Sequence, residues 1–210
     1  MAQMQINMQC RSCSKEYSVP FNGIINVGSD PDLRARVASG EFFLHECPYC
    51  GAKNLIPAQN CLYHDALNKV MIVFSPLSLK MEDVPQDYTC RLVGSIGELI
   101  EKVKIFSASL DDVVIEMCKY VTKMEMIAKI TGKEQQEKLL ATPFHFYKCQ
   151  GEDEGRYLTL MYPSDGTMSG VNIGWNVYQD CLGILSRNPH IRPEDGFASV
   201  DSEFLEHFLK

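Results

Sequence analysis

The segment Cys47-Pro48-Tyr49-Cys50-Gly51 decides how the fold begins, because Cys10-Arg11-Ser12-Cys13 repeats its spacing of two thiols. Two intervening residues let one tight turn bring both sulfurs to the same ion, and Zn²⁺ binds four thiolates tetrahedrally at about 2.3 Å. Gly51 suits a turn whose backbone must bend without a Cβ atom. The pairs therefore predict one structural zinc site, with iron as the open alternative, whose ligands are Cys10, Cys13, Cys47 and Cys50.

The residues between the two pairs accommodate a helix. Ser29-Asp30-Pro31-Asp32 combines a capping side chain, a proline at the first helical position and an acid in the first turn, which is typical of a helix start. Gly40 is typical of a helix end. We expect a helix over 31–39. Before it, one strand should precede the first thiol pair and a second should follow over 17–21; after it, a strand over 41–46 should precede the second thiol pair. This ribbon-like unit covers about residues 6–60.

The remaining sequence predicts a mixed α+β chain. Further strands are expected over 62–74, a loop between Pro76 and Pro85, a helix from the capping box Ser95-Ile96-Gly97-Glu98 to about 106, and a helix from about 111 that ends near Gly132. A polar connector, with helix as an alternative, covers 131–142. The tail predicts a β-hairpin of 144–149 and 156–162, followed by helices near 177–185 and 204–209. The expected domains are 1–130 and 143–210.

The charge balance disfavours two classes of partner. The chain has 20 Lys and Arg against 27 Asp and Glu, a net charge of −7, and no strongly basic segment. Phosphate contacts supply most non-specific affinity for nucleic acids, so neither DNA, RNA nor an anionic membrane is an expected partner.

The compartment is expected to be the cytoplasm. The first residues lack the charged and apolar pattern of a signal peptide, and the longest apolar run, 70–74, suits a buried strand rather than a membrane span. The nine cysteines are reduced there, which favours metal ligation over disulfides for spaced pairs.

These features resemble a known family. The paired CxxC motifs, one of them Cys-Pro-x-Cys, the Asp-Pro-x-Leu helix that ends before Gly40 and Phe42, and the strand Leu62-Tyr63-His64-Asp65 resemble the bacterial CpXC-motif domain family over about residues 6–130. The resemblance implies a four-cysteine, zinc-ribbon-like start with a helical continuation and no characterised function. The first pair departs from the family pattern, because Arg11 stands where the family has proline.

Two enzymatic interpretations stay open beside the structural one. Cys-Pro-Tyr-Cys also occurs as a redox dithiol in glutaredoxin-like proteins, where a helix start lowers the pKa of the first cysteine. Here Gly51 follows the pair and no helical period begins after it. His64 with Asp65 could bind a second metal or transfer a proton, or could be a half-buried histidine that bonds to a backbone carbonyl beside a turn. His45 is expected on the strand surface.

The sequence therefore favours a zinc-binding cytosolic protein that acts as a protein-interaction module. Four thiolates leave zinc no open position for a substrate, so the ion's expected role is folding and no catalytic residue is assigned. The alternative is a thiol oxidoreductase, or another enzyme, that uses the 47–50 pair or His64 and Asp65. Cys118 and Cys181 are expected to be packing residues.

Overall fold

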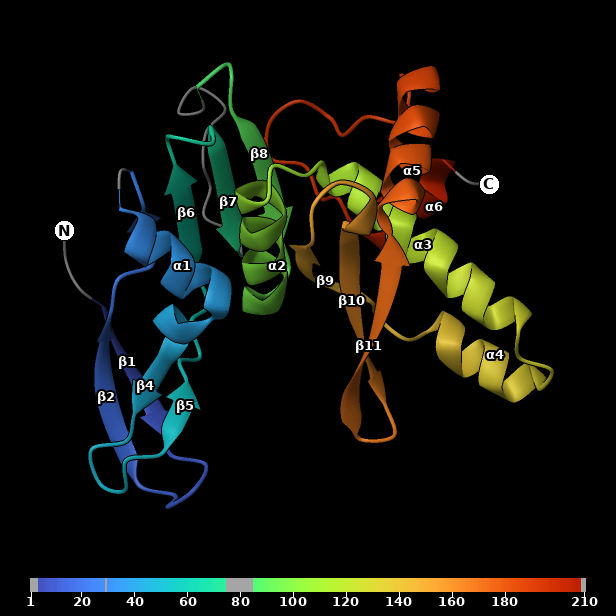
Figure 1. Cartoon of the computed structure of the whole chain (residues 1–210). Coiled ribbons are helices and arrows are strands. Elements are labelled where there is room, and N and C mark those ends of the chain that lie inside the picture. Colours follow the sequence, from blue (N-terminus) through green and yellow to red (C-terminus); the bar gives the residue numbers. More distant parts are fainter. Residues whose placement is uncertain (1–3, 29, 75–84, 209–210) are drawn as a thin grey trace. The chain divides into compact units, whose positions relative to one another are not determined.

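The chain divides into two compact units (Figure 1). The computed structural model describes residues 4–28, 30–74 and 85–208 of the 210-residue chain. The first unit consists of residues 1–103 and 195–198, and the second of residues 104–194 and 199–210, so the division falls inside helix α2 (Ile96–Ser107). Both units contain helices and strands, which agrees with the predicted α+β class. The domain boundary expected at 131–142 stays a prediction.

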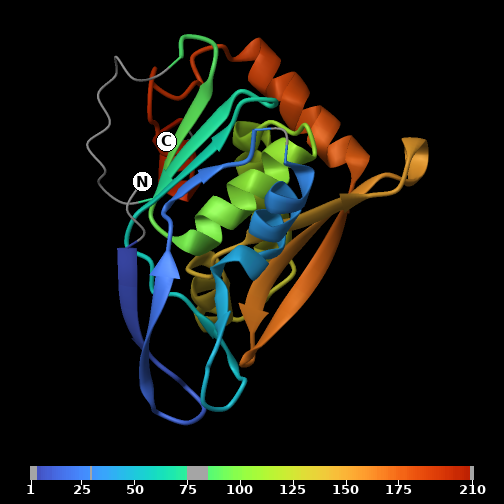
Figure 2. The same ribbon diagram turned by 90° about the vertical axis from the view of Figure 1, so that its left-hand side faces the viewer.

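Two short hairpins begin the first unit. Strands β1 (Met4–Gln9) and β2 (Glu16–Phe21) pair antiparallel, and so do β4 (Leu44–Glu46) and β5 (Lys53–Leu55). The registers end at Gln9 with Glu16 and at Glu46 with Lys53, which leaves two loops of equal length. The hairpins lie side by side with both loops at the same end (Figures 1 and 2). We call the loop of residues 10–15 the first knuckle and that of residues 47–52 the second knuckle.

Helix α1 (Pro31–Ser39) separates the hairpins along the chain and has the predicted bounds. The Asp30 side chain caps its start by accepting the backbone N–H of Leu33 at 3.0 Å. Gly40 ends it with a left-handed φ of 82°. Ser29, the other predicted start residue, lies outside the described residues.

The strand expected over 41–46 is wrong for its first half. These residues form a 3-10 turn, η1 (Glu41–Phe43), because Gly40 reverses the chain and its carbonyl accepts the N–H of Phe43 at 3.0 Å. The side chain of Phe43 is fully buried. Burial of this aromatic side chain stabilises the turn and outweighs the extended conformation expected for these residues.

A four-stranded sheet follows, in the order β3 (Ile24–Asn26), β6 (Cys61–Asp65), β7 (Val70–Phe74) and β8 (Thr89–Val93). β6 and β7 pair antiparallel, while β3 and β8 are added parallel to them at the two edges. Four of the five residues of β7 are buried, as its continuous apolar sequence predicts. The predicted loop between Pro76 and Pro85 lies outside the described residues except for Pro85, and sequence reasoning missed β8.

The capping box at the start of α2 is confirmed. The hydroxyl of Ser95 accepts the N–H of Glu98 at 3.1 Å, and the carboxylate of Glu98 accepts the N–H of Gly94 at 2.8 Å. The first contact satisfies an amide of the first helical turn, and the second binds the residue before the cap to the helix.

The second unit contains helices α3 (Asp112–Ala128) and α4 (Lys133–Leu140). Asp111 caps α3 by accepting two backbone amides, so the predicted start is confirmed. The predicted end at Gly132 is wrong, since α3 stops at Ala128 and Gly132 is the cap residue of α4. No helix in the described ranges has both the length and the apolar character needed to cross a bilayer.

A three-stranded antiparallel sheet completes this unit, with strand order β11 (Thr167–Gly174), β10 (Tyr157–Ser164) and β9 (His145–Gln150). The predicted hairpin corresponds to β9 and β10, and the 3-10 turn η3 (Asp153–Gly155) lies in its loop. β11 was not predicted. Helices α5 (Trp175–Arg187) and α6 (Ser202–Phe208) follow it.

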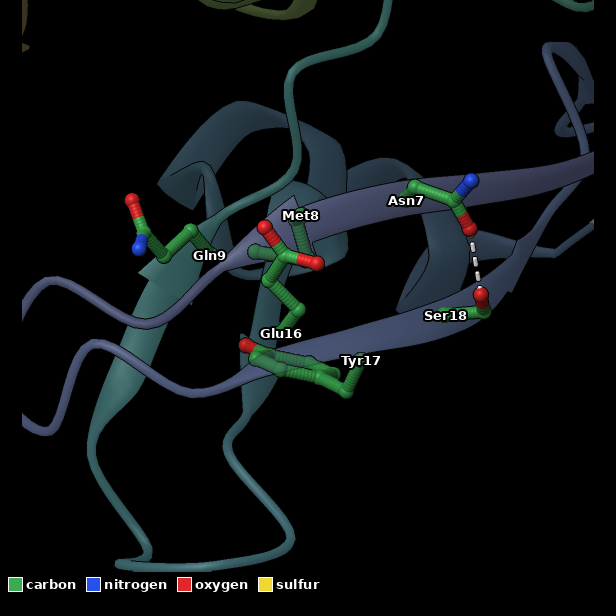
Figure 3. A pocket seen from close by; sticks show the side chains of 6 residues that line it. All are labelled: Asn7, Met8, Gln9, Glu16, Tyr17 and Ser18. Carbon is green, nitrogen blue, oxygen red and sulfur yellow. Dashed lines mark hydrogen bonds between the residues drawn. The ribbon is translucent and has the colours of Figure 1, made fainter.

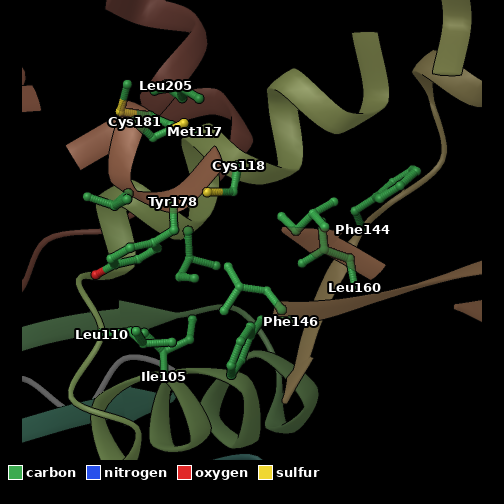
Figure 4. Packing of buried hydrophobic residues seen from close by; sticks show 14 residues of the cluster. Ile105, Leu110, Met117, Cys118, Phe144, Phe146, Leu160, Tyr178, Cys181 and Leu205 are labelled. Carbon is green, nitrogen blue, oxygen red and sulfur yellow. The ribbon is translucent and has the colours of Figure 1, made fainter. Parts of the chain in front are cut away.

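The core of the second unit lies between α3, α5 and the sheet (Figure 4). Leu158 and Leu160 of β10 are fully buried in it. Cys118 and Cys181 are buried in the same cluster, which confirms that they are packing residues.

Candidate metal centre

The two knuckles have the same backbone geometry. In the first, the N–H of Cys10 donates to the carbonyl of Lys15 and the N–H of Ser14 donates to the carbonyl of Cys10, both at 2.9 Å. In the second, Cys47 donates to Ala52 and receives from Gly51, again at 2.9 Å in both bonds. The loop of the first pair therefore folds like that of the second although it lacks the proline.

The residue after each second cysteine has a left-handed backbone. Gly51 has a φ of 74° and Ser14 a φ of 59°. Glycine adopts this conformation without steric cost, while serine does so at some cost. Gly51 therefore adopts a backbone conformation that favours glycine, as the sequence predicted. In the first knuckle, Ser14 adopts the same conformation.

The knuckles bring all four predicted sulfurs together. The Sγ atoms of Cys10 and Cys50 are 3.6 Å apart, and those of Cys13 and Cys47 are 3.7 Å apart. The four sulfurs all lie within 4.8 Å of one another. A tetrahedral zinc site with bonds of about 2.3 Å has sulfur–sulfur edges of about 3.8 Å. The residues present therefore fit a four-thiolate metal site, and the four cysteines together could hold one ion.

Burial differs among the four thiols. Cys10 and Cys47 are buried, Cys13 is half-buried and Cys50 is exposed. The first cysteine of each knuckle thus lies inside the site and the second lies towards its surface. Any reagent that attacks the site is expected to reach Cys50 first.

The electrostatics of the cluster are compatible with a bound cation. The N–H of Cys13, helped by that of Ser12, points at the Cys10 sulfur and lowers its pKa to about 6. The N–H of Ala52 acts in the same direction on Cys50, but burial and the thiols around it outweigh that bond and raise the pKa of Cys50 to about 12. Four sulfurs so close cannot all ionise by themselves, whereas a divalent cation would stabilise all four thiolates.

Asn54 joins the two knuckles, and sequence reasoning missed it. Its side chain is buried, its Nδ2 lies 3.5 Å from the Cys10 sulfur, and its Oδ1 accepts the N–H of Arg11 at 3.0 Å. The only signal in the sequence is an asparagine in a short strand four residues after Cys50.

The aromatic neighbours of the site come from the hairpins. Tyr17 of β2 lies beside His45 of β4, with ring centroids 5.9 Å apart. Burial, followed by the nearby thiolates of Cys47 and Cys10, raises the pKa of Tyr17. His45 is half-buried rather than on the surface, and the metal-binding group consists of the four cysteines without it.

Three cationic side chains close to the two cysteine pairs in sequence lie on the surface. Arg11, Lys15 and Lys53 are exposed. The Lys15 Nζ sits 4.7 Å from the ring centroid of Tyr49, so it connects the first knuckle to the second.

Asp65 has a structural environment. It is buried, and Arg34 of α1 donates to both its oxygens at 2.8 and 2.9 Å. Further hydrogen bonds come from the Tyr63 hydroxyl, from the backbone amides of Leu67 and Asn68, and from the Asn68 side chain. The carboxylate thus holds the β6–β7 turn and α1 against the sheet. This agrees with the interpretation in which Asp65 belongs to a turn and has no role in catalysis or metal binding.

His64 has a different partner from the expected backbone carbonyl. Its Nε2 lies 3.3 Å from the hydroxyl of Tyr88, and the two rings stack at 5.5 Å. His64 and Asp65 therefore have separate partners and do not bond to each other.

A search for a second possible metal site covers the described residues. Among the described residues, the four cysteines form the one group of three or more His, Cys, Asp or Glu that could hold an ion. A hollow along β1 and β2 is lined by Asn7, Met8, Gln9, Glu16, Tyr17 and Ser18 (Figure 3). Glu16 is its single carboxylate, so this hollow offers no second metal site.

The comparison with known families agrees with this geometry. The family model CpXC, described as CpXC protein, matches residues 8–119, which is more than half of the chain. Neither a curated protein nor a solved structure matches. The match spans both knuckles, helix α1 and the sheet of the first unit. The chain therefore belongs to the CpXC family.

Proposed function

We propose that Cys10, Cys13, Cys47 and Cys50 hold one structural Zn²⁺ that folds the first unit of a cytosolic bacterial protein. The convergence of the four sulfurs supports this proposal. Four thiolates complete the tetrahedron and leave no open position for a substrate, so the ion acts on folding rather than on chemistry. The β4–β5 hairpin has only three residues in each strand, which is too little to be stable without a further link.

Elemental analysis of the purified chain tests the identity of the ion. We expect one zinc per chain and less than about a tenth of that amount of iron, because thiolate sites bind Zn²⁺ more tightly than Fe²⁺. The measurement is needed because both metals accept this tetrahedral geometry. A Cys47→Ser variant is expected to lose the metal. A chain that carries iron in place of zinc contradicts the zinc assignment, and a chain without metal contradicts the site.

We also propose that the first unit recognises a protein partner. Leu44 and Leu55 face each other across β4 and β5, and both are more than two fifths exposed. Tyr49 of the second knuckle is 56% exposed. Aromatic and aliphatic side chains on a rigid surface are the groups that protein partners bury.

The matched test compares Leu44→Ser with Leu67→Ser. Leu67 lies in the β6–β7 turn of the same unit and is 71% exposed. We expect Leu44→Ser to abolish the capture of a specific partner while zinc content is unchanged, and Leu67→Ser to retain both. Equal capture by the two variants counts against this surface.

Thiol–disulfide exchange is the second candidate function. The lowered pKa of Cys10 and the exposure of Cys50, whose sulfurs are 3.6 Å apart, favour it for the metal-free chain. Against it, the 47–50 pair lies in a hairpin loop and not at a helix start.

Alkylation separates the two functions. With zinc bound, the four ligand cysteines are expected to react slowly with iodoacetamide, and at least about tenfold faster once a chelator removes the ion, because a metal-bound thiolate is a poor nucleophile. Peptide mass spectrometry gives the rate at each cysteine. The half-buried Cys149 and the buried Cys118 of the second unit are internal controls whose rates should not change. Fast reaction at Cys47 before chelation, with turnover of a disulfide substrate, favours the oxidoreductase.

A further inference from the structure

Asn54 uses every hydrogen-bonding group of its side chain at the boundary between the knuckles. Its Oδ1 accepts the backbone N–H of Arg11 at 3.0 Å. Its Nδ2 donates to the carbonyl of Ala52 at 2.8 Å and points at the Cys10 sulfur at 3.5 Å. The side chain thus contacts the backbone of both knuckles and one of the four sulfurs.

These contacts leave the amide one orientation. If the oxygen and nitrogen were exchanged, the NH₂ group would face the N–H of Arg11 and the oxygen would face the carbonyl of Ala52. Both contacts would then be repulsive. The donor is therefore directed towards Cys10, and because Asn54 is only 4% exposed, water does not replace it easily.

The neighbours of Asn54 keep it in place. Its cross-strand partner is His45, which packs against Tyr17 of the other hairpin. The inner face of the β4–β5 hairpin is thus held against β2, while Leu44 and Leu55 face outward. Asn54 sits on a strand and not on a loop, so its donor has a fixed position relative to both knuckles.

We propose that Asn54 is a positioning residue of the metal centre, which locks the first knuckle onto the second and donates a hydrogen bond to the Cys10 thiolate. The inference rests on the proposed zinc site. A hydrogen bond to a metal-bound thiolate disperses its charge and orients it, and loss of such a partner typically weakens metal binding by about 10- to 100-fold.

The variant Asn54→Asp separates the two parts of this role. A carboxylate at this position still accepts the N–H of Arg11, but it cannot donate to Cys10 and it adds a negative charge beside four thiolates. We expect zinc affinity, measured by competition with a chromophoric chelator, to fall by about 10- to 100-fold. Cys10 of the zinc-loaded variant should also react with iodoacetamide at least about tenfold faster than in the unmodified chain. Loss of the bond to Arg11 is not the cause of either change, because the carboxylate keeps that bond, and the uncharged variant described next separates the lost donor from the added charge.

Two further variants complete the experiment. Asn22→Asp adds the same charge in the same unit after the far end of β2, where the Asn22 oxygen accepts the N–H of Ile24 at 3.0 Å, and it should bind zinc within about twofold of the unmodified chain. Asn54→Ser shortens the side chain, so that it reaches neither the Cys10 sulfur nor the N–H of Arg11, and it adds no charge. It is measured in the same way, so that a folding failure of Asn54→Asp does not end the test.

The outcomes distinguish this inference from the function on which it rests. An unmodified chain that binds no zinc overturns the proposed function. An unmodified chain that binds zinc, together with Asn54→Asp and Asn54→Ser variants within about twofold of its affinity, overturns the role of Asn54 alone. An affinity loss in Asn54→Ser but not in Asn54→Asp also overturns it, because the acceptor for Arg11 would then explain the effect.

Discussion

Removal of the metal is expected to unfold the part of the first unit that contains the two knuckles. Structural zinc contributes roughly 10–16 kcal/mol of folding free energy in small peptides, as much as the whole stability of a typical domain. The hairpins that carry the cysteines are short, and without the ion the four clustered sulfurs can no longer all ionise. Amide hydrogen exchange should show that residues 4–60 lose protection when a strong chelator is added.

A cysteine substitution gives the same result without a chelator. Cys47→Ser removes a buried ligand and should abolish protection of both hairpins, whereas Cys149→Ser should leave metal content and protection unchanged. Cys149 is a fair control because its sulfur accepts a hydrogen bond from Arg156 that a serine oxygen can also accept. Full protection of residues 4–60 after metal removal would contradict a structural role for the ion.

The second large effect is expected at Asp65, away from the metal. Asp65→Asn should lower the free energy of unfolding of the zinc-loaded chain by about 3–5 kcal/mol, because it leaves the guanidinium of Arg34 without its buried counter-charge. The Arg34 and Asp65 side chains are 18% and 2% exposed, so water screens this pair weakly. Urea denaturation followed by circular dichroism measures the difference.

The matched control is the surface pair of Lys69 and Asp87, whose side chains are both more than half exposed. Asp87→Asn should leave stability unchanged within error, because exposed ion pairs contribute little. If Asp65→Asn also leaves the free energy of unfolding unchanged, the hydrogen bonds around Asp65 do not stabilise the first unit.

The effect at Asp65 should depend on pH in one direction. Burial by itself raises the pKa of Asp65, but hydrogen bonds from Arg34 and from Asn68 outweigh it and lower the pKa below its usual value. A lowered pKa in the folded state means that the stabilisation is fully present above the unfolded pKa of about 3.9 and is lost as the pH falls through the folded value. The difference between Asp65→Asn and the unmodified chain should therefore be constant at neutral pH and shrink below about pH 4. The comparison is made only over the pH range in which both chains retain their zinc, because loss of the ion is expected to unfold the segment that carries Arg34.

Local chemistry made the four clustered cysteines and several elements predictable from the sequence. The spacing of Cys10 with Cys13 and of Cys47 with Cys50 depends on one turn each, and both turns have the expected form. The bounds of α1 and the start of α2 depend on capping groups within three residues of the helix end. Such features need no knowledge of distant residues, because the interacting groups are neighbours in the chain.

Tertiary structure alone decided the rest. The chain over 41–43 is a turn because Phe43 is buried. β8 and β11 form because they pair with the neighbouring strands β7 and β10, and such pairing with another strand cannot be read from the sequence of either strand alone. Asn54 contacts the first knuckle 43 residues away, and Asp65 pairs with Arg34 31 residues away. By itself, the sequence determined which atoms could bind a metal. The fold determined which buried polar side chains hold those atoms in place. Burial, and hydrogen bonds between residues distant in the sequence, exist only in the folded chain.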